Sequence, residues 1–195
     1  KVFGLIEIFW EKEIIDTALS LTARGGIQNL TIRNLAENLD ITEPAIYRHF
    51  KNKSEIVKTM IKNFEVAGNQ KIASVSSEGI TGVEKFVKSR FALVANNPPL
   101  AKVLFSEELF MDEPEYGELL MNMMHKHKDS LKVMLLKAQK DGDIRNDIEF
   151  DMLFRLIMGP VRLLIKQWGL SGSSFDLIEK GDLLWESLKK TLKLQ

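Results

Sequence analysis

The stretch LAENLDITEPAIYRHFKNKSEIV, residues 35–57, holds an unusually short helical segment from Thr42 to Phe50. On a helical wheel, Ile46 and Phe50 share one face of this segment. A helix this short is unstable alone in water, so it must dock on neighbouring helices through its apolar face. The opposite face and its edge carry side chains that suit polar recognition, namely Tyr47, Arg48 and His49. The pattern therefore predicts a docked helix with an outward binding face.

The residues before this segment predict a second helix that precedes a tight turn. Thr31 is a favourable N-cap residue. Apolar side chains then recur at the spacing of one buried stripe, at Ile32, Leu35, Ala36 and Leu39. Asp40 tolerates the left-handed backbone conformation that a tight turn requires. In the short helix that follows, Thr42 is the expected cap and Pro44 fits the first turn, where no N–H is needed.

The outward face of the short helix is rich in groups that bind nucleic acids. Arginine pairs with guanine through two hydrogen bonds, and tyrosine or histidine can reach a phosphate or a thymine methyl group. Lys53 lies at the start of the next helix, for which Ser54 is the expected cap, and free N–H groups there favour anions. Thr31 places a hydroxyl group and another helix start on the other side. We therefore predict a short helix in a DNA groove, flanked by phosphate contacts.

Helical periodicity continues along the rest of the chain, and no segment shows the alternation of a strand. A first helix is expected from Leu5 to Arg24, and a longer one from Ser54 to about Val75. The predicted fold class is all-α with about nine helices. A three-helix module, residues 1–56, is joined through the long helix to a larger helical bundle, residues 57–195.

Composition limits the other possibilities. The 195 residues carry 27 basic and 27 acidic side chains, so DNA binding would depend on a local cluster of charge. The absence of cysteine excludes disulfides and thiol catalysis and fits a reducing cytoplasm. No apolar run is long enough for a membrane span. We find no nucleophile–base motif, phosphate loop or metal cluster, and expect neither an enzyme nor a bound cofactor or metal.

The run LTIRNLAENLDITEPAIYRHFKNKSEIV, residues 30–57, resembles the helix-turn-helix of the tetracycline-repressor (TetR) family of bacterial regulators. The resemblance rests on the small residue at the helix crossing, the apolar anchor, the aromatic pair and the basic turn, which are Ala36, Ile46, Tyr47, Phe50 and Lys51-Asn52-Lys53. The sequence departs from the family pattern where Asp40 replaces the usual glycine and Glu43 brings a negative charge. The apolar and acidic start of the chain also lacks the basic arm that the family often carries.

The resemblance implies roles for individual residues. Arg33 matches a position that can reach a base, and Lys53 matches the phosphate-binding lysine. With the hydroxyl groups inferred above, the expected DNA contacts are Thr31, Arg33, Thr42, Glu43, Pro44, Ala45, Tyr47, Arg48, His49 and Lys53. Double-stranded DNA is the expected partner, bound by a homodimer at a palindromic operator.

The larger bundle is expected to hold an effector and the dimer surface. Its middle helices are rich in Phe and Met, which suit an adaptable apolar pocket for a small molecule. The candidate pocket residues are Phe91, Phe105, Met124, His127 and Met158, with His127 as a possible polar anchor. The candidate dimer residues lie in the apolar stripes of the last two helices and are Leu156, Val161, Leu164, Leu184 and Leu188.

These features predict a ligand-responsive regulator, most often a repressor. Two alternatives stay open at this point. The chain could be a helical small-molecule or lipid carrier that keeps the module as a scaffold, or an architectural DNA-binding protein without an effector. Salt-sensitive binding to a palindromic duplex distinguishes the regulator from the carrier.

Overall fold

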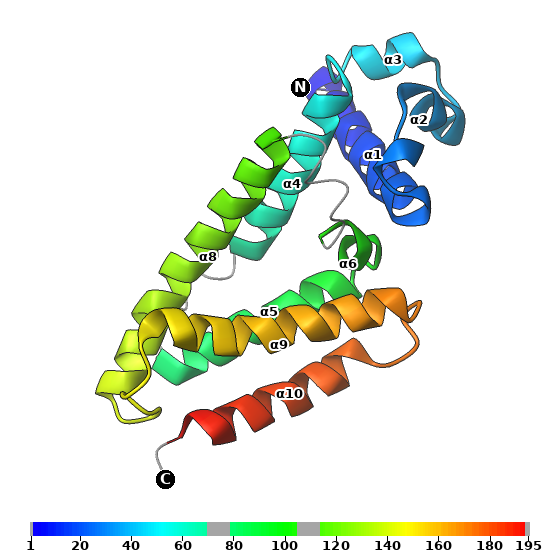
Figure 1. Ribbon diagram of the computed structural model, residues 1–195. Coiled ribbons are helices and arrows are strands. Elements are labelled where there is room, and N and C mark those ends of the chain that lie inside the picture. Colours follow the sequence, from blue (N-terminus) through cyan, green and yellow to red (C-terminus); the bar gives the residue numbers. More distant parts are fainter. Residues whose placement is uncertain (1, 70–78, 105–113, 194–195) are drawn as a thin grey trace. The chain divides into compact units, whose positions relative to one another are not determined.

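The computed structural model describes residues 2–69, 79–104 and 114–193. Within these ranges the chain forms nine α-helices, one short 3-10 helix and no strand, which confirms the predicted all-α class (Figure 1). The elements are α1 (Val2–Gly25), η1 (Ile27–Asn29), α2 (Ile32–Leu39), α3 (Glu43–Tyr47), α4 (Lys53–Asn69), α5 (Gly79–Ala95), α6 (Pro99–Val103), α8 (Pro114–Lys140), α9 (Phe150–Leu170) and α10 (Leu177–Leu192). None of these helices is long and apolar enough to cross a membrane.

The chain divides into two compact units. The first contains Lys1–Phe64 and Lys102–Leu120, and the second contains Glu65–Ala101 and Met121–Gln195. The helices α4 and α8 therefore each contribute residues to both units. The predicted continuation of α4 to Val75 lies outside the described residues.

The first unit is built on α1, which packs against η1 and α2. Its inward face is almost fully buried, at Ile14, Ile15, Ala18, Leu19 and Leu21. Gly26, with φ 73°, lets the chain turn at the end of α1. Leu35 and Ala36 of α2 are buried as well.

The second unit contains α5, α9 and α10, which lie side by side in Figure 1. Glycines allow close approach at two contacts. A Cβ atom on Gly181 of α10 would lie 2.5 Å from Cδ2 of Phe91 in α5. A Cβ atom on Gly169 of α9 would lie 2.8 Å from the Cβ atom of Ala101. The side chain of Trp185 is completely buried in the second unit, so this unit has a hydrophobic core of its own.

Candidate nucleic-acid interface

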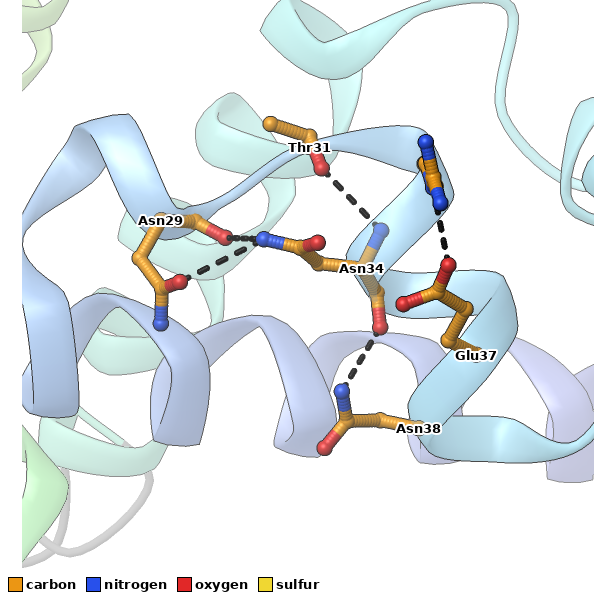
Figure 2. Close-up of polar contacts among 6 residues, drawn as sticks. Asn29, Thr31, Asn34, Glu37 and Asn38 are labelled. Atoms are coloured by element: carbon orange, nitrogen blue, oxygen red, sulfur yellow. Dashed lines mark hydrogen bonds and ion pairs between the residues drawn. The ribbon is translucent and has the colours of Figure 1, made fainter.

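A tight turn connects α2 to α3 and confirms two local predictions. The hydroxyl oxygen of Thr31 accepts a hydrogen bond from the backbone N–H of Asn34 at 3.0 Å, so Thr31 caps α2 (Figure 2). At the other end, Asp40 adopts the left-handed conformation with φ 52° and ψ 44°. The Ile41 N–H donates to the Ala36 carbonyl oxygen at 3.0 Å, and the Asp40 N–H donates to that of Glu37 at 3.4 Å. This is the Schellman pattern, with aspartate where glycine is commonest.

The short helix α3 docks through its predicted apolar face. The side chain of Ile46 is fully buried and that of Phe50 is 4% exposed. Regular α-helix covers only Glu43–Tyr47, which is shorter than the predicted 42–50. The chain then tightens, because the His49 and Phe50 N–H groups both donate to the Ile46 carbonyl oxygen, at 2.9 and 3.0 Å. This last turn brings Phe50 inward.

The predicted side-chain cap at Thr42 is wrong. The Thr42 hydroxyl makes no capping hydrogen bond, although its carbonyl oxygen accepts from the Ala45 N–H at 2.9 Å. The reason lies in the first turn of α3. Pro44 has no N–H to offer, and the N–H of Ala45 is directed to the Thr42 backbone. The Thr42 side chain is therefore exposed rather than engaged in a cap.

The outward face of α3 is accessible. Tyr47 is 50% exposed, which is high for a tyrosine side chain. Pro44 and Arg48 are also exposed, and His49 is half-buried beside them. The remaining predicted members of this face are Glu43, which is exposed, and Ala45, which is half-buried. The structure therefore brings the predicted groove-facing residues together on α3 and the turn that follows it.

Arg33 of α2 lies close to two acidic side chains. Its Nε atom donates to Oε1 of Glu37 at 2.8 Å, and both side chains are largely exposed. The hydrogen bond to Glu37 raises the pKa of Arg33, with further contributions from the charges of Glu37 and of Glu43 at the start of α3. The predicted base-reading guanidinium is thus held along α2 by a carboxylate in this structure.

An asparagine network that the sequence interpretation missed fixes the entry to α2 (Figure 2). The Asn34 amide nitrogen donates to the Asn29 backbone carbonyl at 2.8 Å, and the Asn38 amide donates to the Asn34 carbonyl at 2.8 Å. The Asn29 amide reaches back to the Leu21 carbonyl of α1 at 3.0 Å. The network thereby links α1 to the helix start that carries Thr31. Its sequence signal was the asparagine pair four residues apart on one helix face.

Lys53 connects the start of α4 to the segment before α2. Its ammonium group donates to the Ile27 carbonyl oxygen at 2.9 Å. The predicted cap at Ser54 is wrong, since Asn52 caps this helix by accepting from the Glu55 N–H at 2.9 Å. The Glu55 carboxylate in turn accepts from the Lys51 N–H at 2.6 Å. Asparagine and serine are about equally good N-cap residues, and Asn52 holds the cap position here. Glu55, three residues later, completes a reciprocal pair close to a capping box.

A groove of about 340 Å³ opens at the start of α4 and was also missed. Three lysines line it, together with polar and acidic neighbours: Lys51, Asn52, Ser54, Glu55, Lys58, Thr59 and Lys62. Lys58 forms an ion pair with Glu115 in the first turn of α8. Part of the signal was present in the sequence, because Lys58 and Lys62 are four residues apart on α4, a spacing that places them on one helix face, whereas Lys51 lies in the turn before this helix.

The predicted pocket residues occupy different surroundings in the second unit. Phe91 is buried where α5 meets Gly181 of α10. Its neighbour Arg90 instead reaches α8, where Nη1 of Arg90 lies 3.3 Å from Nε2 of His127. Met124 and Met158 are half-buried, as is His127, and Phe105 lies outside the described residues.

The predicted dimer residues are also divided. Leu156 is 50% exposed on α9, whereas Val161 is completely buried in the core of its own unit. The other three are half-buried, and these are Leu164, Leu184 and Leu188. Further apolar side chains are largely exposed on the same two helices, at Met152, Leu163, Leu170, Ile178 and Leu183. Within one protomer, α9 and α10 thus keep accessible apolar surface.

The capped α2, the tight turn and the docked α3 define a helix-turn-helix module, the class of structure that regulatory proteins insert into DNA grooves. The family profile described as "Bacterial regulatory proteins, tetR family" matches residues 14–60, which contain this module. The chain is 22% identical over 189 residues to the "Probable acrEF/envCD operon repressor" of Escherichia coli (strain K12), covering 91% of this chain and 84% of that protein. The chain is therefore similar to bacterial regulators of the tetR family, and the family profile matches its helix-turn-helix module.

Solved structures share the fold along nearly the whole chain. The transcriptional regulator FadR from Bacillus subtilis, in complex with stearoyl-CoA, matches with a TM-score of 0.78 and 19% identity over 93% of this chain and 98% of that one. The ketosteroid transcriptional regulator KstR2 of Mycobacterium tuberculosis matches with a TM-score of 0.79 and 15% identity over 95% of each chain. These likenesses support the predicted arrangement of an amino-terminal helix-turn-helix followed by a helical bundle.

Proposed function

We propose that this protein is a ligand-responsive transcriptional repressor that binds a palindromic operator as a homodimer. The observation that carries the proposal is the docking of α3. Ile46 and Phe50 anchor this helix from one side, while Pro44, Tyr47 and Arg48 stay accessible on the other. Such a helix can enter the major groove while Ile46 and Phe50 stay packed in the core.

The proposal assigns sequence choice and affinity to different residues. Glu43, Pro44, Ala45 and Arg48 face base edges, and Tyr47 and His49 contact bases or phosphates, as does the nearby Thr42 hydroxyl. Thr31 and Lys53 contact phosphates beside the two helix starts. Arg33 exchanges Glu37 for the DNA, since a largely exposed ion pair is weak in water.

The lysine groove extends the proposed phosphate contacts along α4. Lys51 and Lys62 are exposed at its rim. Phosphate contacts of this kind carry no sequence information, but they supply much of the affinity and make it sensitive to salt. The groove therefore adds positive charge locally in a chain whose net charge is zero.

Dimerisation is proposed to occur through the accessible apolar surfaces of α9 and α10. Leu156 and Leu183 illustrate them, since these side chains are 50% and 55% exposed. Burying such surface against a second copy is favourable by about 25 cal/mol per Å² of apolar area. A two-fold pair would present two α3 helices to half-sites about 34 Å apart.

The second unit is proposed to bind an effector that is small and apolar or amphipathic. The structural relative FadR from Bacillus subtilis is in complex with stearoyl-CoA, which has a long apolar acyl chain and a polar head. Both α4 and α8 contain residues of each unit, and the Lys58–Glu115 ion pair joins them. An effector that favours one position of α4 over another would change the spacing of the reading helices and release DNA. The proposed action involves no catalysis and takes place in the cytoplasm, where the operator is.

Selection of bound sequences from a random duplex library tests the proposal. We expect the selected duplexes to contain an inverted repeat, and fluorescence anisotropy to show two protomers per duplex. Arg48→Ala should lower the preference for the selected sequence over a scrambled one, whereas Arg155→Ala on α9 should not. A wild-type protein that binds no duplex above background at low salt would contradict the proposal and favour a ligand carrier.

A further inference from the structure

We infer that Glu43 and Arg33 together select one G·C base pair in each operator half-site, with Glu43 on the amino group of cytosine and Arg33 on the paired guanine. The inference rests on the proposed function and adds the base pair that the reading surface requires. Both side chains are exposed, Arg33 on α2 and Glu43 at the start of α3. They carry opposite charges on two helices that pack against each other.

The backbone of Glu43 is closely supported. Glu43 is the first residue of α3, and Ile46, three residues later, is fully buried. The Thr42 carbonyl oxygen closes the first turn by accepting from the N–H groups of Ala45 and Ile46 at 2.9 and 3.4 Å. Pro44 restricts this turn further, because its ring fixes φ. The structure thus fixes the main chain at Glu43 and leaves the carboxylate accessible.

The chemistry of a carboxylate limits what Glu43 can contact on DNA. An ionised carboxylate only accepts hydrogen bonds, so phosphates repel it. In the major groove, N7 and O6 of guanine and O4 of thymine are acceptors as well. Adenine presents its amino group beside the acceptor N7, whereas cytosine presents an amino group alone. Cytosine is therefore the base that matches an exposed glutamate at the start of the reading helix.

Arg33 supplies the opposite charge. Its Nε atom donates to Oε1 of Glu37 at 2.8 Å, and the two side chains are 78% and 58% exposed. An ion pair this exposed is weak, so a guanine can replace Glu37 at small cost. The pKa of Arg33 is raised mainly by the hydrogen bond to Glu37, and the charge of Glu43 adds to the shift. Arg33 and Glu43 are thus near enough for their charges to interact.

A single G·C pair presents the pattern that these two charges need. Guanine offers O6 and N7, which arginine binds through two hydrogen bonds, and the amino group of the paired cytosine lies beside them. A T·A pair in the same orientation would place the O4 acceptor and the methyl group of thymine against the Glu43 carboxylate. The pair of side chains therefore favours the right base pair and also penalises a wrong one.

Selection from a random duplex library with the wild-type protein and with Glu43→Gln tests the inference. We expect the wild-type protein to require cytosine at one position of each half-site. Glu43→Gln should move the preference there from cytosine towards adenine, because glutamine pairs with N6 and N7 of adenine. Asp129→Asn is the matched control, since it removes one exposed negative charge from α8 and should leave the selected sequence unchanged.

Modified duplexes then identify the atoms that are read. N4-methylcytosine keeps its base pairing but replaces the amino hydrogen that faces the major groove. In one half-site it should weaken wild-type binding about tenfold in anisotropy, the factor for one hydrogen bond to a charged group, and should affect Glu43→Ala little. In the same way, 7-deazaguanine at the paired position lacks N7 and should weaken the wild-type protein about tenfold but Arg33→Ala little. Inosine, which keeps O6 and N7, is the control base.

A half-site without a required cytosine, an unchanged preference in Glu43→Gln, or full wild-type affinity for the N4-methylcytosine duplex would overturn the inference. A Glu43 that only stabilises the start of α3 would give this result, because its loss would weaken all duplexes equally. The modified duplexes need only the wild-type protein, so the test stays valid if a variant does not fold. In each of these cases the protein still binds its operator, whereas a wild-type protein that binds no duplex would overturn the proposed function together with the inference.

Discussion

The lysine groove at the start of α4 gives a quantitative test of how the module binds DNA. Lys51 and Lys62 are exposed at this groove. Lys53 and Lys58 are less suitable targets, because they contact the Ile27 carbonyl and Glu115 and their loss would also disturb the fold. The informative change is therefore the double substitution of Lys51→Gln and Lys62→Gln, which removes charge and leaves the described packing intact.

Each lost phosphate contact lowers the slope of log affinity against log salt concentration by about 0.9. Two lysines in each of two protomers should lower the slope by about 3.6. Between 50 and 200 mM salt, the wild-type protein should then lose about 150-fold more affinity than the variant. Fluorescence anisotropy with the selected duplex at several sodium chloride concentrations measures both slopes.

A control variant separates phosphate contact from a general effect of charge. Lys132→Gln with Lys140→Gln removes the same charge from exposed positions on α8 in the second unit. This control should change the slope little, because phosphates beyond about 10 Å are screened at these salt concentrations. The reasoning is refuted if the groove variant keeps the wild-type slope, or if the control lowers the slope as much.

Three further substitutions test the packing that positions the module and its bundle. Gly181→Ala should lower the free energy of unfolding by about 1–3 kcal/mol, since the new Cβ atom would meet Phe91 at 2.5 Å; thermal unfolding that is unchanged would show that this contact relaxes freely. Ile46→Ala should lower the free energy of unfolding by about 2–5 kcal/mol, measured in urea, because α3 loses its fully buried anchor. It should also abolish duplex binding in anisotropy, and retained specific binding would contradict this role. Asp40→Gly should raise the free energy of unfolding by up to about 1 kcal/mol, because glycine adopts φ 52° without a Cβ clash; a loss of stability in urea would mean that the aspartate side chain itself stabilises the turn.

Much of the helix-turn-helix could be predicted because its determinants are local. The Thr31 cap depends on a residue three positions later, and the Asp40 turn depends on hydrogen bonds to carbonyls three and five positions back along the chain. The burial of Ile46 and Phe50 follows from a spacing of four residues on one helix. Interactions between residues so close along the chain follow from residue type and helical spacing, so both could be predicted from the sequence.

The two N-cap predictions at α3 and α4 were wrong because other groups near each helix start determine which residue caps it. Thr42 and Ser54 are both good N-cap residue types. Thr42 does not cap α3 through its side chain because Pro44 has no backbone N–H to donate, and the position of Pro44 was visible in the sequence. Ser54 fails because Asn52 takes the Glu55 N–H first, and α4 therefore starts at Lys53. Residue type predicted that a helix starts in each place, but the identity of the capping group depended on backbone geometry.

Contacts between distant residues could not be predicted from periodicity. The bond from Lys53 to the Ile27 carbonyl spans 26 residues, and the contact of Arg90 with His127 spans 37. A single stripe on α9 likewise gave no means of telling the buried Val161 from the exposed Leu156. Helical periodicity identifies a face, and only the neighbouring helix decides which part of it is covered.

The surroundings of Arg33 and Lys53 suggest how a chain of zero net charge can still bind DNA. In the free protein, Arg33 forms an exposed ion pair with Glu37, and the charge of Glu43 also acts on it. The Lys53 ammonium group donates to the backbone carbonyl oxygen of Ile27, which orients it at the start of α4. Arg33 must leave Glu37 before it can bind DNA. The release of Arg33 should therefore occur only where a base or a phosphate replaces the Glu37 carboxylate.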